Sequence, residues 1–289
     1  SVHSAATVIL LRDAGRGMEV FLMRRHRGQS FMGGAHVFPG GRVDEGDRAR
    51  GLERFVVMPG GVSLPELLRE PALADSDALG VYIAAIRETF EEAGILLARG
   101  DGIGAFAADD DAERERLTRL RTGLHDGTIT MAGLAEETGI LYDTGMLTPY
   151  SHWTTPDVET KRFDTRFFIA AVPEGQVPSH DNLEMTDSLW IRPAEALARH
   201  GRGELLLMPP TLTTMTELSG FSGIDEAVSF ARRRFIFPIL PQASVVDNGF
   251  CVLLPHDPDY CIEEYKQPVR PGEISRVVMR EGVWMTEAP

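Results

Sequence analysis

The stretch ALGVYIAAIRETFEEAGI at Ala78–Ile95 decides the fold, because its apolar residues follow the period of an amphipathic helix. They recur every three to four positions, at Tyr82, Ile86, Phe90 and Ala93. Asp77 is placed to cap the start of this predicted helix, and Gly94 stands where a glycine commonly ends one. The pattern therefore predicts a helix that buries one apolar face.

A second face of this helix carries three carboxylates, those of Glu88, Glu91 and Glu92. Their spacing makes them neighbours, and like charges at that spacing repel each other. The segment contains no lysine that could balance them. A hard divalent cation such as Mg²⁺ would, because it prefers oxygen ligands. The alternative is a solvated acidic face with Arg87 as its counterion.

A glycine turn precedes the helix, within HVFPGGRVDEGD at His36–Asp47. The run Pro39-Gly40-Gly41 lets the backbone approach a ligand, because no side chain stands in the way. This turn favours the interpretation in which the acidic face binds a ligand.

The turn and the helix together resemble the two halves of the Nudix box. Residues 87–95, RETFEEAGI, match the second half, R-E-apolar-x-E-E-x-G-apolar, with Thr89 as a variant. Residues 41–47 match the first half, G-x5-E, with Asp47 in place of the glutamate. The 39 residues of 48–86 stand where the box has seven, and this insertion leaves the role of Asp47 open.

The chain is similar to the coenzyme A diphosphatase branch of the Nudix hydrolases, whose box carries an insertion at this place. Other matching segments are FMGGAHVFPGG at 31–41, SHWTTPDVETKRFDTRFFI at 151–169, LMPPTL at 207–212 and PILP at 238–241. The resemblance implies an α/β fold, the Nudix α/β/α sandwich with a mixed β-sheet. We expect one domain over residues 1–289, with an insertion at 48–77, a helical insertion at 103–140 and a C-terminal extension at 207–289.

The resemblance also implies roles for the box residues. The carboxylates of Glu88, Glu91 and Glu92 and the carbonyl of Gly41 would bind Mg²⁺ or Mn²⁺. Arg87 would orient Glu88 or Glu91 through an ion pair. The expected catalytic residues are Glu91, Glu88, Arg87 and Glu184.

Glu184 enters this set from a later predicted strand, LEMTDSLWIR, where it lies six residues before Trp190. The family carries an acid at that place which holds metal or positions water. A carboxylate on the solvated face of a strand is the alternative.

Two basic clusters are candidates for binding substrate phosphates, because the planar guanidinium of arginine matches phosphate oxygens. The first, Arg24 and Arg25, directly precedes the glycine turn, and the second is Lys161 and Arg162. The first cluster could instead be a solvated strand end, and Arg162 could pair with a neighbouring aspartate.

Composition limits the partners of the chain. A net charge of −14 argues against a protein that coats nucleic acid, which would show a basic face. Two cysteines without a metal-binding spacing indicate reduced thiols. The apolar run in the opening SVHSAATVILLRD is too short for a membrane span and lacks the pattern of a signal peptide. We expect a cytoplasmic protein without nucleic-acid or membrane partners, and a homodimer is compatible with the resemblance.

Three functions follow as hypotheses. The first is metal-dependent hydrolysis of coenzyme A or acyl-CoA to phosphopantetheine, or its acyl form, and adenosine 3′,5′-bisphosphate. The second is pyrophosphatase activity on NADH or ADP-ribose. The third is a catalytically silent Nudix fold that binds a nucleotide, against which the intact Glu88, Glu91 and Glu92 argue.

Overall fold

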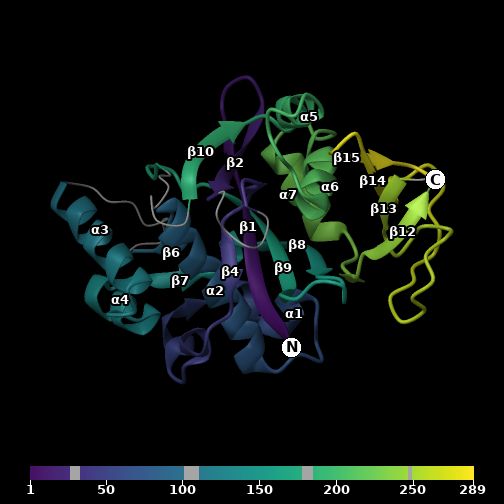
Figure 1. Cartoon of the computed structure of the whole chain (residues 1–289). Coiled ribbons are helices and arrows are strands. Elements are labelled where there is room, and N and C mark those ends of the chain that lie inside the picture. Colours follow the sequence, from purple (N-terminus) through teal and green to yellow (C-terminus); the bar gives the residue numbers. More distant parts are fainter. Residues whose placement is uncertain (27–32, 101–110, 178–184, 247–248) are drawn as a thin grey trace.

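A mixed β-sheet forms the centre of the computed structural model, which describes residues 1–26, 33–100, 111–177, 185–246 and 249–289 (Figure 1). Its strand order is β10-β2-β1-β9-β8-β11, with β3 added to β2 and β4 added to β1. The strands are β1 (Val2–Asp13), β2 (Met18–Arg25), β3 (His36–Val37), β4 (Gly40–Arg42), β8 (Thr148–Thr154), β9 (Arg162–Ala171), β10 (Met185–Ile191) and β11 (Pro238–Ile239). β1 is parallel to β9 and antiparallel to β2, so the expected mixed sheet is confirmed.

β1 is buried on both faces. Successive side chains of a strand point to opposite sides, so its apolar residues reach both faces of the sheet. Val8 and Leu10 pack into one apolar cluster, whereas Ile9 and Leu11 pack into another. An apolar run without alternation is typical of a central strand covered on both sides. The ATVILL segment of β1 therefore requires a layer of helices on each face of the sheet.

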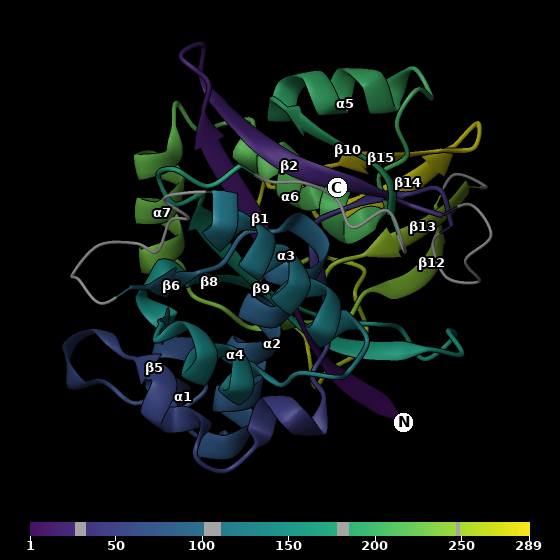
Figure 2. The same ribbon diagram turned by 90° about the vertical axis from the view of Figure 1, so that its left-hand side faces the viewer.

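Seven helices occur in the described part of the chain and supply these layers. They are α1 (Leu64–Leu68), α2 (Asp75–Ala93), α3 (Asp111–His125), α4 (Met131–Thr138), α5 (Pro193–Gly201), α6 (Pro209–Leu218) and α7 (Ile224–Arg233). Helices α1 to α4 cover one face and α5 to α7 the other (Figure 1). Figure 2 views the first layer from outside, with α3 and α4 in front of α2. The predicted α/β/α sandwich is confirmed.

The helix predicted from Ala78 to Ile95 is α2, and it begins three residues earlier, at Asp75. Ala74 occupies the N-cap position, so the prediction of Asp77 as the cap was wrong. The carboxylate of Asp77 pairs with Arg48 at 2.9 Å instead of bonding to its own helix end. Gly94 ends α2 as predicted, because its φ of 69° is a left-handed conformation that suits glycine.

Two smaller sheets lie outside the central one. A three-stranded sheet joins the two insertions: it contains β5 (Val56–Val57) from the insertion at 48–77, and β6 (Ala98–Arg99) and β7 (Leu141–Asp143), which flank the insertion at 103–140. A four-stranded antiparallel sheet in the C-terminal extension contains β12 (Gln242–Val246), β13 (Gly249–Leu253), β14 (Arg276–Arg280) and β15 (Val283–Glu287). Val277 and Trp284 of the extension join the same apolar cluster as Ile9 and Leu11 of β1, so the extension packs on the core.

Candidate functional site

The glycine turn approaches the centre of the sheet because two strands, β2 and β4, pair with different parts of one edge of β1. Residues 11–13 of β1 pair with β2, whereas residues 5–7 pair with β4. β4 therefore pairs with the part of β1 that β2 does not reach. A Cβ added to Gly40 would lie 2.5 Å from the carbonyl oxygen of Ala6. A Cβ on Gly41 would lie 2.3 Å from Oε1 of Glu88. The two glycines therefore allow a contact that no other residue type fits.

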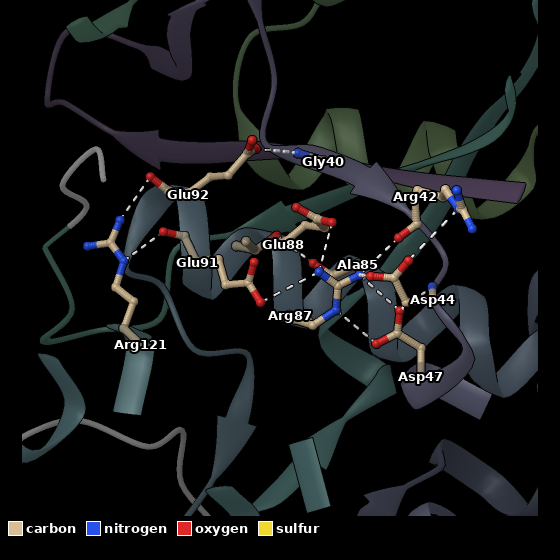
Figure 3. A network of polar contacts seen from close by, with 11 residues as sticks. Gly40, Arg42, Asp44, Asp47, Ala85, Arg87, Glu88, Glu91, Glu92 and Arg121 are labelled. Carbon is tan, nitrogen blue, oxygen red and sulfur yellow. Dashed lines mark hydrogen bonds and ion pairs between the residues drawn. The ribbon is translucent and has the colours of Figure 1, made fainter. Parts of the chain in front are cut away.

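The acidic end of α2 lies against this turn (Figure 3). The backbone N–H of Gly40 donates to Oε2 of Glu92 at 2.8 Å. The side chains of Glu88 and Glu91 are only 14% and 13% exposed. Both carboxylates are thus mostly shielded from water, so the solvated face of the alternative is wrong for them, although Arg87 is their counterion as that alternative expected.

Arg87 connects the two halves of the split box. Its Nη1 lies 2.8 Å from Glu88 and 3.5 Å from Glu91, so the expected ion pairs of this arginine are present. Its Nε and Nη2 each donate to Asp47 at 2.9 Å, and Nη2 also donates to the carbonyl of Arg42. The residue left without a role by the sequence, Asp47, is therefore the bidentate partner of Arg87, with a side chain only 2% exposed.

The electrostatics of the cluster favour a bound cation. Burial raises the pKa of Glu88 to about 7, although the charge of Arg87 opposes the shift. Burial also raises the pKa of Glu91, against the same opposing charge. Burial alone would lower the pKa of Arg87, but its hydrogen bond to Asp47 and the surrounding carboxylates raise it above the ordinary value. One arginine does not compensate all of these carboxylates, so additional positive charge would stabilise them.

The donor atoms suit Mg²⁺ or Mn²⁺, because all of them are hard oxygens. Among the described residues, no three acidic, histidine or cysteine side chains are already arranged around one point that an ion could occupy. One oxygen of Glu92 is engaged by Gly40, whereas Glu88 and Glu91 both face the Nη1 atom of Arg87. The residues fit a divalent ion by the chemistry of their oxygen atoms, with Glu88 and Glu91 next to the same nitrogen of Arg87.

The first basic cluster lies beside the glycine segment. Arg24 pairs in register with His36 of β3 on one side and with Asp187 of β10 on the other, and Arg25 follows at the strand end. The backbone N–H of Arg25 donates to the carbonyl of Ala35 at 2.9 Å. The structure therefore brings Arg24 and Arg25 to the chain segment that leads into the glycine turn.

His36 is a buried base at this place that the sequence did not single out. Its Nδ1 atom has no hydrogen-bond partner within the described residues. Burial, together with the charges of Arg24 and Arg199, lowers the pKa of His36 to about 4, while the hydrogen bond to the Leu206 carbonyl and the charge of Asp187 act in the opposite direction. His36 is therefore neutral at pH 7.

The second basic cluster lies elsewhere. Arg162 pairs in register with Val2, four residues along β1 from the Ala6 that pairs with Gly41, which is roughly 13 Å. It lines a cavity of about 540 Å³ beside the N-terminal half of α2, not the carboxylates. Its Nε donates to Thr155, and its guanidinium pairs with Asp157, the alternative considered from the sequence. The adjacent Lys161 is exposed.

That cavity has a charged wall built from the box insertion and the sheet. Arg166 of β9 makes a bidentate pair with Glu70, at 2.9 and 2.8 Å, and also bonds Asp164. His152 of β8 lies 2.7 Å from Asp164. These contacts fasten the insertion at 48–77 to the sheet. Glu184, the remaining predicted site residue, lies outside the described residues.

No helix in the described part of the chain combines the length and the apolar composition required to cross a bilayer.

Known proteins share both the sequence and the fold. The model of the NUDT19 Nudix domain family matches residues 3–218. Acyl-coenzyme A diphosphatase NUDT19 of Xenopus laevis is 30% identical over 276 residues, covering 84% of this chain and 71% of that protein. The protein of the same name from Gallus gallus is 30% identical over 303 residues, covering 91% and 80%.

Among solved structures, a Nudix hydrolase from Alicyclobacillus acidocaldarius superimposes with a TM-score of 0.63 at 26% identity, covering 79% of this chain and 96% of that one. The family match spans both halves of the split box and the sheet on which they meet. The chain therefore belongs to the NUDT19 Nudix domain family and is a Nudix hydrolase.

Proposed function

We propose that the protein hydrolyses the diphosphate of coenzyme A or acyl-CoA, with Mg²⁺ or Mn²⁺ as cofactor. The products are phosphopantetheine, or its acyl form, and adenosine 3′,5′-bisphosphate. The observation that carries the metal-dependent reaction is the shielded pair Glu88 and Glu91, held by Arg87 beside Gly40 and Gly41. The choice of substrate is supported by relatives named acyl-coenzyme A diphosphatase.

The metal would be held by carboxylates of Glu88, Glu91 and Glu92 and by the carbonyl of Gly41. When bound, it supplies charge neutralisation for the diphosphate and lowers the pKa of water. Arg87 fixes the Glu88 carboxylate at 2.8 Å. Glu88 or Glu91 would accept the proton of the attacking water. The water oxygen, rather than a side chain, bonds to one phosphorus while the bond from that phosphorus to the bridging P–O–P oxygen breaks and the other phosphate leaves with the bridging oxygen.

Arg24 and Arg25 are the proposed phosphate ligands of the protein, because β2 ends next to the segment that leads to Gly40. Their planar forks would bind phosphate oxygens that the metal does not reach. Lys161 and Arg162 belong to the other end of the sheet. We therefore leave them out of the diphosphate site, and keep Glu184 as a candidate for positioning water.

The test is product analysis by mass after incubation with Mg²⁺ and, separately, coenzyme A, an acyl-CoA, NADH and ADP-ribose. Glu91→Gln removes a proposed ligand. Glu136→Gln is the matched control, because Glu136 is 57% exposed and pairs with Arg54 on the surface. We expect adenosine 3′,5′-bisphosphate from both coenzyme A compounds, lost with EDTA and in Glu91→Gln but not in Glu136→Gln.

The other outcomes separate the parts of the proposal. Cleavage of NADH or ADP-ribose alone would support the proposed catalytic site but overturn coenzyme A or acyl-CoA as the substrate. Cleavage that persists unchanged in EDTA would overturn the proposed requirement for a metal ion. Absence of cleavage with every compound, together with retained nucleotide binding, would favour the silent binding protein.

A further inference from the structure

Helix α3 of the helical insertion packs against the catalytic end of α2. Its apolar stripe, Leu117, Leu120 and Leu124, faces the same core cluster as Phe90 of α2. Arg121 lies four residues after Leu117 and three before Leu124, on the edge of this stripe. Burial of the leucines therefore fixes the position from which Arg121 reaches α2.

Arg121 bonds the backbone of two proposed metal ligands (Figure 3). Its Nε donates to the carbonyl oxygen of Glu91 at 2.7 Å, and its Nη2 donates to that of Glu92 at 3.0 Å. The side chain is half-buried, so these bonds are partly shielded from water.

These two bonds add to the backbone capping at the end of α2. The last four carbonyls of a helix have no partner within it. The turn at Gly94 covers two neighbouring carbonyls, since Gly94 N–H donates to Phe90 at 2.9 Å and Ile95 N–H donates to Thr89 at 3.4 Å. The next two carbonyls are those of Glu91 and Glu92. The planar guanidinium of Arg121 donates a hydrogen bond to each of them.

The positive charge of Arg121 also stabilises the end of α2, in addition to its hydrogen bonds. A helix C-terminus carries a partial negative charge, to which the carboxylates of Glu88, Glu91 and Glu92 add. A guanidinium on the terminal carbonyls offsets this repulsion and holds the last turn wound. If that turn frayed, the backbones of Glu91 and Glu92 would move, and their carboxylates with them.

We infer that Arg121 is a positioning residue: its guanidinium locks the last turn of α2, so that Glu91 and Glu92 are preorganised for a divalent cation. The inference rests on the proposed function, in which these glutamates bind the metal. Groups that orient metal ligands typically contribute about 10- to 100-fold in metal affinity.

The experiment measures Mn²⁺ dissociation constants of the full chain by titration calorimetry, without substrate. The variants are Arg121→Gln and Arg121→Lys. Arg119→Gln and Arg119→Lys are the matched controls, because Arg119 lies on the same helix with a 63% exposed side chain paired to Glu137. We expect about 10-fold weaker Mn²⁺ binding in Arg121→Gln. Arg121→Lys should show a smaller loss, because lysine keeps the charge but not the fork. Both controls should bind as the wild type does.

Kinetics separate positioning from a purely structural role. At saturating Mn²⁺, kcat of Arg121→Gln should recover towards that of the wild type, with KM for acyl-CoA unchanged. A lower urea midpoint with an unchanged Mn²⁺ dissociation constant would overturn the inference. If Arg121→Gln does not fold, Arg121→Lys against Arg119→Lys carries the test, and equal Mn²⁺ binding by these two would overturn it.

The proposed function fails separately. A wild-type chain that binds no Mn²⁺, or a Glu91→Gln variant that binds it equally well, would overturn the metal assignment and with it the inference. Loss of Mn²⁺ binding in Glu91→Gln with full binding in Arg121→Gln would overturn the inference alone.

Discussion

Asp47→Asn tests the interaction that joins the two halves of the split box. The Asp47 carboxylate accepts three hydrogen bonds: from Nε and Nη2 of Arg87, each at 2.9 Å, and from the backbone N–H of Asp44 at 2.8 Å. The exposed fractions of the two side chains are 2% for Asp47 and 11% for Arg87. Asparagine keeps the shape but removes the charge, and one of its atoms becomes a donor facing the guanidinium.

The expected cost follows from burial. Removing one partner of a buried ion pair costs about 3–5 kcal/mol, because the other charge stays buried. Arg87 retains Glu88 at 2.8 Å and Glu91 at 3.5 Å, which places Asp47→Asn at the lower end, about 3 kcal/mol.

Asp77→Asn is the matched control. Asp77 also pairs with an arginine, Arg48, at 2.9 Å, but these side chains are 46% and 31% exposed. An exposed pair of this kind contributes at most about 1 kcal/mol. The two substitutions remove the same group at the same distance and differ in solvent access.

Urea unfolding followed by tryptophan fluorescence measures both variants. We expect a fall in the midpoint for Asp47→Asn at an unchanged slope, since the surface exposed on unfolding is the same. Equal losses for Asp47→Asn and Asp77→Asn would refute the reasoning, because burial would then have no effect on the value of the pair.

Two further perturbations address the glycine turn and the buried histidine. Gly41→Ala places a Cβ 2.3 Å from Oε1 of Glu88, so the carboxylate must move. We therefore expect kcat/KM to fall by about 100-fold. Gly46→Ala is the control: its Cβ has open space around it, and the variant should retain activity. His36 binds a proton less tightly when folded, at a pKa of about 4 against 6.5. Its contribution is therefore fully present above pH 6.5 and is lost as the pH falls towards 4, by about 3 kcal/mol. Urea midpoints from pH 7 to 4 should fall less steeply for His36→Gln, and identical slopes would contradict the assignment.

Local patterns predicted the elements well, because each depends on neighbouring residues. The helix predicted from the period of its apolar residues is α2, and Gly94 ends it as predicted. The split box was recognisable because each of its halves, residues 41–47 and 87–95, is a continuous motif that matches the family pattern. The N-cap of α2 was misplaced, because the carboxylate of Asp77 is taken by Arg48, which lies 29 residues away in sequence.

Contacts across the fold were not predictable in the same way. Arg121 lies in the predicted helical insertion at 103–140, and no local signal in the sequence marks its contact with α2. Arg162 carried the right charge for a phosphate, but only the parallel register of β9 with β1 places it opposite Val2. Its spacing in the chain holds no information on that register.

The sequence by itself determined the family through the motifs of the split box, and the resemblance to that family implied the mixed α/β architecture. The crowding of Glu88, Glu91 and Glu92 followed from their spacing on one helix. Only the tertiary structure decided that Asp47 is the buried partner of Arg87, 40 residues away in the chain, and that Gly41 meets Glu88. The physical reason is that ion pairing and close packing depend on distance in space and on exclusion of water. The sheet and its helices set both of these together, after chain segments far apart have met.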